Sequence, residues 1–289
     1  MSVPQVSAII VNYNAGGELA TALQSIADEL GERPWEAVVV DNASSDGSAG
    51  AATAFAPRAR VLQNRDNVGF ARGVNQGLAA TSAATVLIMN PDCRLERGAI
   101  DGLTAELERG DRMALAGPRI LNPDGSVQGS ARGDPDMLTG LFGRTAALRR
   151  MLPDLGIGKR NVIAADVGGA SIDVDWVSGA CMLARRSALE RVNGFDERYF
   201  LYWEDADLCR RLRGQGYQIR YVPGATAVHR VGHSSRVARS ASIRAFHDSA
   251  YLYYATHVAP TVSPKRLAAK VLLSARCWLK LQQSRSLLK

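Results

Sequence analysis

Short apolar runs rich in valine and isoleucine recur through the first third of the chain, and each run ends in polar residues. Between these runs, apolar residues recur at helical spacing near residues 18–30, 47–55 and 71–80. This alternation predicts an α/β fold whose parallel strands are joined by helical crossovers. The predicted strands are Val6–Asn14, Trp35–Ser44, Ala59–Asn64 and Ala84–Asn90.

Polar residues gather where these predicted strands end. In open sheets of this kind the ligand binds beyond the carboxyl ends of the strands, so these residues form the candidate site. They are Asn12–Asn14, Asp41–Ser44, Asn64–Asn67 and Asn90–Asp92.

The second half of the chain has a less regular pattern. A hairpin turn is predicted at Pro123–Gly125, followed by a partly helical stretch to about residue 154 and a glycine-rich loop near residues 168–169. A strand then enters a short helix that ends before Gly194, another helix follows Trp203, and an extended run leads to His229. We expect one domain over residues 1–240 and a helical tail over residues 241–289.

Length and composition fit a large globular domain. The chain has 289 residues, of which 46% are hydrophobic, enough to bury a sizeable core. Its four cysteines lack the spacing of a zinc or disulfide framework, which favours reduced thiols in the cytosol. No signal peptide is apparent, and no apolar run reaches the roughly 20 residues of a spanning helix, so we expect a soluble or peripheral protein.

Basic charge is concentrated in the tail. The net charge is +7, and residues 264–289 hold seven basic side chains and no acid, so the remainder of the chain is neutral. This distribution disfavours nucleic acid as a partner. Within residues 265–281 the basic side chains fall on one helical arc and the apolar ones on the other, except Leu273. Such a helix is typical of a membrane-surface anchor; the alternative is packing on its own domain or on a second copy.

Two common nucleotide motifs are absent from the sequence. The first strand leads into NYNAGGEL rather than G-x-G-x-x-G, and there is no P-loop, which disfavours NAD enzymes and P-loop NTPases. Side chains at strand ends remain as nucleotide ligands. Asp41 can accept a hydrogen bond from the ring N–H of uracil or thymine, and Arg72 and Asn75 can reach base or phosphate. Asp41 can equally form a turn and helix cap with Ser44.

A lone carboxylate, Asp92, follows Pro91 at the end of the fourth predicted strand. There it can hold Mg²⁺ or Mn²⁺ against a diphosphate, since these ions take oxygen ligands and retain waters; otherwise it is a surface turn residue. His229 ends a later extended run and is a candidate further ligand or a structural histidine. His233 follows it at a spacing that by itself is weak for zinc.

Three acids, Glu204, Asp205 and Asp207, begin a predicted helix beside Tyr202 and Trp203. The helix dipole favours acids at this position, so at least one is expected to have a capping role. A carboxylate in an aromatic-lined cleft can also serve as a general base.

Together these motifs resemble the family-two inverting glycosyltransferases of the GT-A fold, within them the rhamnosyltransferase-like branch of bacterial surface polysaccharide synthesis. The matching stretches run in family order over about residues 6–235. They are VSAIIVNYNAG, VVVDNASSDGS, NVGFARGVNQG, LIMNPDC, GPRILNPDGSVQGS, the segment from Trp176 to Tyr217, and VPGATAVHRVGHSS. The resemblance implies a nucleotide-binding half, residues 1–112, and an acceptor-binding and catalytic half, residues 113–240.

The resemblance also implies roles for individual residues. Asp92 matches the metal-binding acid of the D-x-D element, His229 an additional metal ligand, and Asp205 the catalytic base, with Glu204 beside it. Asn90 departs from the family pattern because it replaces the first acid of D-x-D. The acceptor would meet Trp203, Tyr202 and Gly179. The implied donor site comprises Asn12, Tyr13, Asn14, Asp41, Asn67, Gly69, Arg72, Asn75 and Asn90.

The activity implied is metal-dependent transfer of L-rhamnose from dTDP-L-rhamnose to a lipid-linked glycan. It would take place on the cytoplasmic face of the inner membrane, with the tail as anchor and a homodimer as one possible state. Two alternatives stay open: a UDP-hexose donor on the same fold, and a module that binds sugar nucleotide or polysaccharide without transfer.

Overall fold

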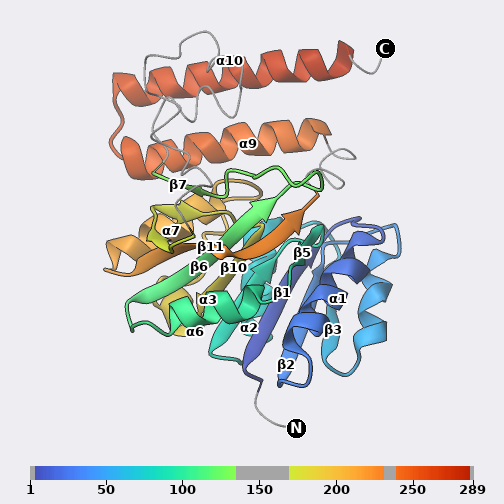
Figure 1. Ribbon diagram of the computed structural model, residues 1–289. Coiled ribbons are helices and arrows are strands. Elements are labelled where there is room, and N and C mark those ends of the chain that lie inside the picture. The colour runs from blue at the N-terminus through green and yellow to red at the C-terminus, as the bar shows by residue number, and fades with distance from the viewer. Residues whose placement is uncertain (1–3, 135–168, 231–238, 287–289) are drawn as a thin grey trace.

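A nine-stranded mixed sheet with helices on both faces forms the centre of the molecule (Figure 1). The computed structural model describes residues 4–134, 169–230 and 239–286. The predicted partly helical stretch, residue 168 of the predicted glycine-rich loop, and His233 lie outside the described residues. The strands of this sheet are β1 (Val6–Asn12), β2 (Trp35–Asp41), β3 (Ala59–Gln63), β4 (Thr85–Met89), β5 (Cys93–Leu95), β6 (Met113–Leu121), β8 (Ile172–Asp173), β10 (Cys181–Arg185) and β11 (Gln218–His229).

The first four predicted strands are confirmed as neighbours in the sheet. The order is β3-β2-β1-β4-β10-β6-β11-β5, with β8 on β11, and β1 to β4 run parallel. β10 is antiparallel to β4 and β6, which makes the sheet mixed. The predicted hairpin turn is confirmed as well, since Asn122 N–H donates to Ser126 O at 2.7 Å. A small second sheet pairs β7 (Ala131–Arg132) with β9 (Trp176–Val177).

Helices cover the two faces of the sheet with separate cores. The helical segments are α1 (Glu18–Leu30), η1 (Ser48–Phe55), α2 (Phe70–Ala79), α3 (Ala99–Leu107), α6 (Arg186–Arg191), α7 (Glu204–Gly214), α9 (Arg239–Tyr253), η3 (Tyr254–Val258) and α10 (Pro264–Ser286). One core lies between the sheet and α1, η1 and α3, and the other between the sheet and α2, α6 and α7. Strands buried on both faces explain the continuous apolar runs of the sequence.

Two glycines let α2 approach the sheet closely. A Cβ atom at Gly73 would lie 2.9 Å from Val11 Cγ1, and one at Gly77 would collide with Ile9. Larger side chains there would push the helix away from β1. The start of α2, which follows Gly69, is therefore held near the ends of the strands.

The predicted helical tail is confirmed as the pair α9 and α10, which lie side by side beyond the ends toward which β6 and β11 point (Figure 1). Ala269 and Leu273 of α10 are buried. Leu273, the exception to the apolar arc of the sequence, thus belongs to the packed face. Among the described residues, no helix combines the length and apolar content needed to cross a bilayer.

Candidate active site

The ends of β1 and β2 are joined by a buried polar network. Asn12 and Asp41 are paired in register, and both are almost fully buried. Asn12 Nδ2 donates to Asp41 Oδ1 at 2.6 Å, to Ser48 Oγ at 2.8 Å and to Ser44 Oγ at 3.1 Å. The network ties the loop after β2 to the end of β1.

Both oxygens of the Asp41 carboxylate are engaged in this network. Oδ1 also accepts from Ser44 Oγ at 2.6 Å, while Oδ2 accepts from Ser44 N–H at 3.0 Å and Gln63 Nε2 at 2.5 Å. Burial alone would raise the pKa of Asp41, but the hydrogen bonds from Ser44, Asn12 and Gln63 outweigh it and lower that pKa. Because a carboxylate has about four acceptor sites, none is left in this arrangement for a nucleobase.

Tyr13 and Asn14 follow Asn12 at the half-buried rim of the strand ends. Asn14 has a left-handed backbone (φ 50°), and its side-chain Oδ1 accepts from Ser45 N–H at 2.8 Å. Its own N–H donates to Ser44 Oγ at 2.9 Å. These bonds hold the two strand-end loops against each other and leave the rim accessible.

The remaining predicted donor residues lie around the start of α2. Asn67 Oδ1 accepts from Gly69 N–H at 3.0 Å. Asn75 donates to Phe195 O at 2.9 Å and accepts from Phe195 N–H at 2.9 Å, so its amide links α2 to the segment before α7. Arg72 lies 3.7 Å from Glu197 in an exposed ion pair. The structure thus places Arg72 and Asn75 against residues 194–197.

Asn90, Asp92 and His229 meet at the ends of β4 and β11. His229 Nε2 lies 3.2 Å from Asp92 Oδ1 and 3.3 Å from Asn90 Nδ2. The side chains of His229 and Asp92 are only 12% and 13% exposed. Antiparallel pairing of β5 with β11 aligns His229 with Cys93, and Arg230 N–H donates to Asp92 O at 2.9 Å. Strand pairing therefore holds these two side chains together.

Asp92 and His229 fit as two ligands of one small cation. Ligand atoms each about 2.1 Å from a metal ion and at right angles to one another lie about 3.0 Å apart, close to the observed separation. In the parts of the chain that the structure describes, no group of three or more His, Cys, Asp or Glu side chains could hold a metal ion. A cation here would complete its shell with waters and ligand phosphate, as Mg²⁺ usually does.

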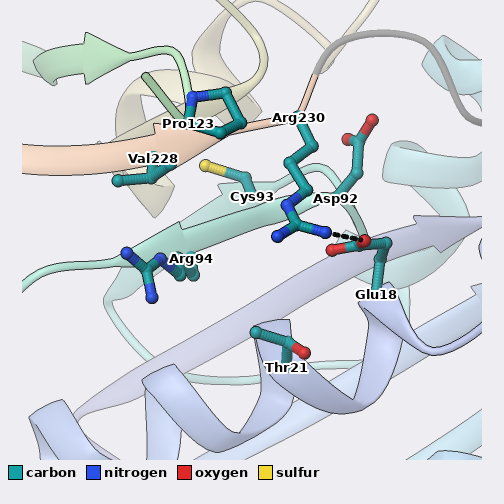
Figure 2. Close-up of a pocket in the computed structure, with 8 residues that line it drawn as sticks. All are labelled: Glu18, Thr21, Asp92, Cys93, Arg94, Pro123, Val228 and Arg230. Carbon is teal, nitrogen blue, oxygen red and sulfur yellow. Dashed lines mark hydrogen bonds and ion pairs between the residues drawn. The ribbon is translucent and has the colours of Figure 1, made fainter. Parts of the chain in front are cut away.

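A small cavity of about 210 Å³ adjoins Asp92 (Figure 2). Across it, Arg230 Nη1 and Glu18 Oε1 form an ion pair at 3.1 Å, and the Asp92 carboxylate points away from this pair. Binding sites for drug-sized ligands usually measure about 300–1,000 Å³. This cavity therefore adjoins the Asp92 site but is too small to hold a whole sugar nucleotide.

The Ser178–Ala180 segment contacts Asp205 through one residue and the end of β4 through the next. Gly179 N–H donates to Asp205 Oδ2 at 2.9 Å, and the next residue, Ala180, accepts from Asn90 N–H through its carbonyl oxygen at 2.9 Å. One short segment thus connects the predicted base to the end of β4. Gly179 also leaves room for Asp205, since a Cβ atom at Gly179 would lie 3.5 Å from Asp205 Cβ.

The three acids at the start of α7 have different surroundings. Asp205 is half-buried, Glu204 is buried, and Asp207 is paired with Arg211 at 2.7 Å and His257 at 2.6 Å. Burial, with Asp205 nearby, raises the pKa of Glu204 well above its ordinary value. Oε2 of Glu204 has no hydrogen-bond partner among the described residues. Trp203 is the N-cap residue of α7, and its side chain makes no capping hydrogen bond.

Tyr202 and Trp203 lie next to the acids and both adopt left-handed backbone angles, φ 70° and 71°. Such conformations are costly for bulky residues and are often found at functional sites. The ring centroid of Phe246, in α9, lies 5.8 Å from that of Tyr202 and 5.9 Å from that of Trp203. The ring centroids of Tyr253 and Trp203 are 5.4 Å apart. The helical tail therefore supports the loop that leads into α7 and its three acids.

Sequence reasoning missed Gln128, whose Oε1 lies 3.1 Å from His229 Nδ1. Gln128 follows the hairpin turn after β6, and only strand pairing brings that turn to His229. Neither its residue type nor its spacing signalled this contact.

The mixed, mostly parallel sheet flanked by helices is the GT-A type of glycosyltransferase fold. Solved structures of similar fold include the mannosyltransferase PcManGT from Pyrobaculum calidifontis with GDP-Man and Mn²⁺ (18% identity, TM-score 0.58, 96% of this chain and 70% of that chain). Another is GalNAc-T7 with UDP, GalNAc and Mn²⁺, at 15% identity and a TM-score of 0.60. The match covers 79% of this chain and 44% of that chain.

The chain belongs to glycosyl transferase family 2, whose model matches residues 7–155. A second model, glycosyl transferase family group 2, matches residues 141–246. The chain is 35% identical to N-acetylglucosaminyl-diphospho-decaprenol L-rhamnosyltransferase of Mycobacterium tuberculosis (strain CDC 1551 / Oshkosh), over 86% of this chain and 83% of the relative. It is 41% identical to rhamnosyltransferase WbbL of Escherichia coli (strain K12), over 35% of this chain and 38% of that relative.

Proposed function

We propose that this protein transfers L-rhamnose from dTDP-L-rhamnose to a hydroxyl of a lipid-linked glycan, with inversion at the anomeric carbon, in bacterial cell-surface polysaccharide synthesis. The family supports the reaction class, and the M. tuberculosis relative, through its name, supports rhamnose as the sugar and a polyprenyl-diphosphate-linked acceptor. One observation carries the proposal for the site: the Ser178–Ala180 segment bonds both to Asp205 and to the strand end that carries Asp92.

In the proposed reaction Asp205 acts as the general base. Its carboxylate takes the proton of the acceptor hydroxyl while that oxygen attacks the anomeric carbon from the face opposite the diphosphate. The bond from the anomeric carbon to the acceptor oxygen forms as the bond to the diphosphate oxygen breaks, and dTDP leaves. The Gly179 N–H orients the base, and Tyr202 and Trp203 form the acceptor side of the cleft.

Asp92 and His229 would hold a divalent cation, Mg²⁺ or Mn²⁺, with Asn90 bonded to its waters or to a ribose hydroxyl. When bound, the cation supplies Lewis-acid stabilisation of the negative charge on the leaving diphosphate. Support comes from the 3.2 Å separation of the two ligand atoms and from their shared burial.

We propose that residues 1–112 bind the nucleotide and residues 113–240 bind the acceptor. Tyr13 and Asn14 at the rim would contact the nucleotide directly. Because both oxygens of Asp41 are engaged, we assign to it the ordering of the loop that carries Ser44, and through that loop the placement of Asn14. Asn12, Asn67, Gly69, Arg72 and Asn75 complete this donor half.

We propose that α10 lies on the cytoplasmic surface of the inner membrane. The structure packs α10 on α9 through its buried residues and leaves a row of apolar side chains exposed: Leu267, Val271, Leu272, Trp278 and Leu279. No acid follows Asp248 in the sequence. An exposed apolar row on a helix whose charged side chains are all basic matches an anionic bilayer surface, where a lipid-linked acceptor is found.

The base is tested with Asp205→Asn. The two oxygens of Asp205 accept from Gly179 N–H and Ala206 N–H, and asparagine keeps one of these hydrogen bonds but cannot take the proton. We expect dTDP-dependent thermal stabilisation to persist and rhamnose transfer to native membranes to fall by at least about 100-fold. Glu32→Gln, which alters a fully exposed acid between α1 and β2, is the control. Near-normal transfer by Asp205→Asn would remove the proposed base.

The donor is tested by incubating the wild type with radiolabelled dTDP-rhamnose or UDP-hexoses and native membranes. Labelled glycolipid from dTDP-rhamnose alone supports the proposal, whereas labelling from a UDP-hexose alone supports the other donor class. Tight binding of donor without any labelled product would favour a module that no longer transfers.

A further inference from the structure

Gln128 links the hairpin after β6 to the His229 imidazole. Its Nε2 donates to Asn122 Oδ1 at 2.8 Å and to the His229 carbonyl oxygen at 2.8 Å. Its Oε1 lies 3.1 Å from His229 Nδ1. One amide therefore contacts both the backbone and the ring of the same histidine.

These partners determine which way the Gln128 amide points. A backbone carbonyl can only accept a hydrogen bond, so the amide nitrogen must face the His229 carbonyl, and the amide oxygen must face the ring. An oxygen can only accept, so Nδ1 of His229 must carry the proton. The other ring nitrogen, Nε2, then keeps its lone pair directed toward Asp92 and Asn90.

The position of Gln128 is itself anchored. Its backbone N–H donates to Ile120 O at 2.8 Å. Asn122, which accepts from its side chain, is held in turn by a bond of 2.8 Å from Nδ2 to Ser126 Oγ. The side chain is thus fixed from the turn on one side and from β11 on the other.

We infer that Gln128 is a positioning residue that locks His229 in the tautomer and ring orientation needed to bind a divalent cation through Nε2. The inference rests on the proposed metal site. A histidine ligand is commonly oriented by a hydrogen bond from its other ring nitrogen, and loss of that partner typically weakens metal affinity about 10–100-fold. Without Gln128 the neutral ring can place its proton on Nε2 and donate it to Asp92, which would block the ligand atom.

Two substitutions separate the acceptor role of Gln128 from its other bonds. Gln128→Leu and Gln128→Glu both remove the amide N–H donors, but only glutamate keeps an oxygen that can face Nδ1. Gln24→Leu, on the exposed side of α1, is the control for a Gln→Leu change elsewhere.

The first measurement is the tautomer of His229 by long-range ¹H–¹⁵N NMR of the metal-free, full-length protein at a pH where the ring is neutral. The wild type, Gln24→Leu and Gln128→Glu should show the proton on Nδ1, and Gln128→Leu should show a shift toward Nε2. A folded Gln128→Leu protein with an unchanged tautomer would overturn the inference.

The second measurement is Mn²⁺ affinity in the presence of saturating dTDP, read by electron paramagnetic resonance of free Mn²⁺. We expect Gln128→Leu to bind Mn²⁺ about 10–100-fold more weakly than the wild type and Gln128→Glu to retain most of the affinity. Equal loss in both variants would contradict the acceptor role.

His229→Ala separates failure of the inference from failure of the proposed site. If His229→Ala binds Mn²⁺ as tightly as the wild type, the proposed metal site is wrong. If His229→Ala binds weakly while Gln128→Leu binds normally, the metal site stands and only the positioning role of Gln128 is lost.

Discussion

At the scale of single residues, neighbouring acids in one motif are set apart by their surroundings. Asp205 is half-buried and accepts a hydrogen bond from Gly179, whereas Glu204 is buried with its Oε2 unpartnered among the described residues. Burial, with Asp205 nearby, raises the pKa of Glu204 and so favours the neutral acid over a free carboxylate. The environment therefore favours Asp205 as the base of the pair.

The raised pKa of Glu204 predicts a pH dependence of stability. The folded state binds this proton more tightly than the unfolded state, so wild-type stability should fall as pH rises above 4.5, the ordinary value for the group. Glu204→Gln carries no such proton. We expect this variant to lose less stability than the wild type between pH 5 and pH 8 in urea denaturation.

The matched control for this prediction is Glu197→Gln, at an exposed acid paired with Arg72. It should keep the pH dependence of the wild type. Parallel pH curves for Glu204→Gln and the wild type would show that Glu204 is not protonated in the folded protein.

At the scale of elements, the start of α2 meets the loop that leads into α7. Phe70 N–H donates to Phe200 O at 2.8 Å, and Gly69 has φ 87° and ψ 173°, a region open essentially to glycine alone. A Cβ atom at Gly69 would lie 2.5 Å from Phe200 O. Backbone contact between the two elements thus requires a glycine at this position.

Gly69→Ala should therefore both destabilise the protein and displace the loop that leads into the acids at the start of α7. Gly98→Ala is the matched control: Gly98 also precedes a helix with positive φ, 80°, but nothing lies within 4 Å of its added Cβ. We expect Gly98→Ala to cost about 1–2 kcal/mol and Gly69→Ala to cost more.

Thermal unfolding and transfer assays test this prediction together. Gly69→Ala should lower the rate of transfer at a temperature where the protein is fully folded, and Gly98→Ala should not. Equal effects of the two substitutions would show that the contact with Phe200 is unimportant.

At the scale of the whole molecule, the helical tail supports the site and presents a separate surface. Through Phe246 and Tyr253, α9 packs against Tyr202 and Trp203, while α10 packs on α9 and exposes its apolar row. Arg276 lies over the Phe246 ring at 5.8 Å, so part of the basic arc faces inward. The tail therefore connects the proposed membrane surface to Tyr202 and Trp203, the proposed acceptor side of the site.

The proposed membrane surface predicts binding to vesicles. Wild-type protein should sediment with vesicles that contain anionic phosphatidylglycerol and much less with phosphatidylcholine alone, and high salt should weaken binding because salt screens the basic side chains. Val271→Asp with Trp278→Glu should abolish sedimentation while dTDP-dependent thermal stabilisation persists. Val61→Asp, at an exposed valine of β3, is the control.

The same variants distinguish a membrane from a second copy of the chain. If the wild type sediments with no vesicle and forms a dimer in analytical ultracentrifugation that Val271→Asp with Trp278→Glu dissociates, the apolar row is a dimer interface and the membrane proposal is wrong.

Local sequence pattern accounts for the strands, their polar ends and the motifs that identify the family. Burial on both faces of a sheet demands continuous apolar runs, and a strand must end where such a run ends, so Asn12, Asp41, Asn90 and Asp92 were placed from local pattern alone. The resemblance then paired Asp92 with His229 as ligands of one metal, and the structure brings the two side chains within 3.2 Å.

The partners of these side chains depend on how distant segments pack together. Pairing of β11 with β5 brings His229 to Asp92, and pairing of β11 with β6 brings the hairpin of Gln128 to His229. Packing decides that Asp41 is fully engaged. It also turned the apolar arc of α10 outward, with Leu273 buried instead. Local sequence shows whether a side chain is apolar or charged. What that side chain contacts depends on segments distant in the sequence, because these segments meet only when the whole sheet is assembled.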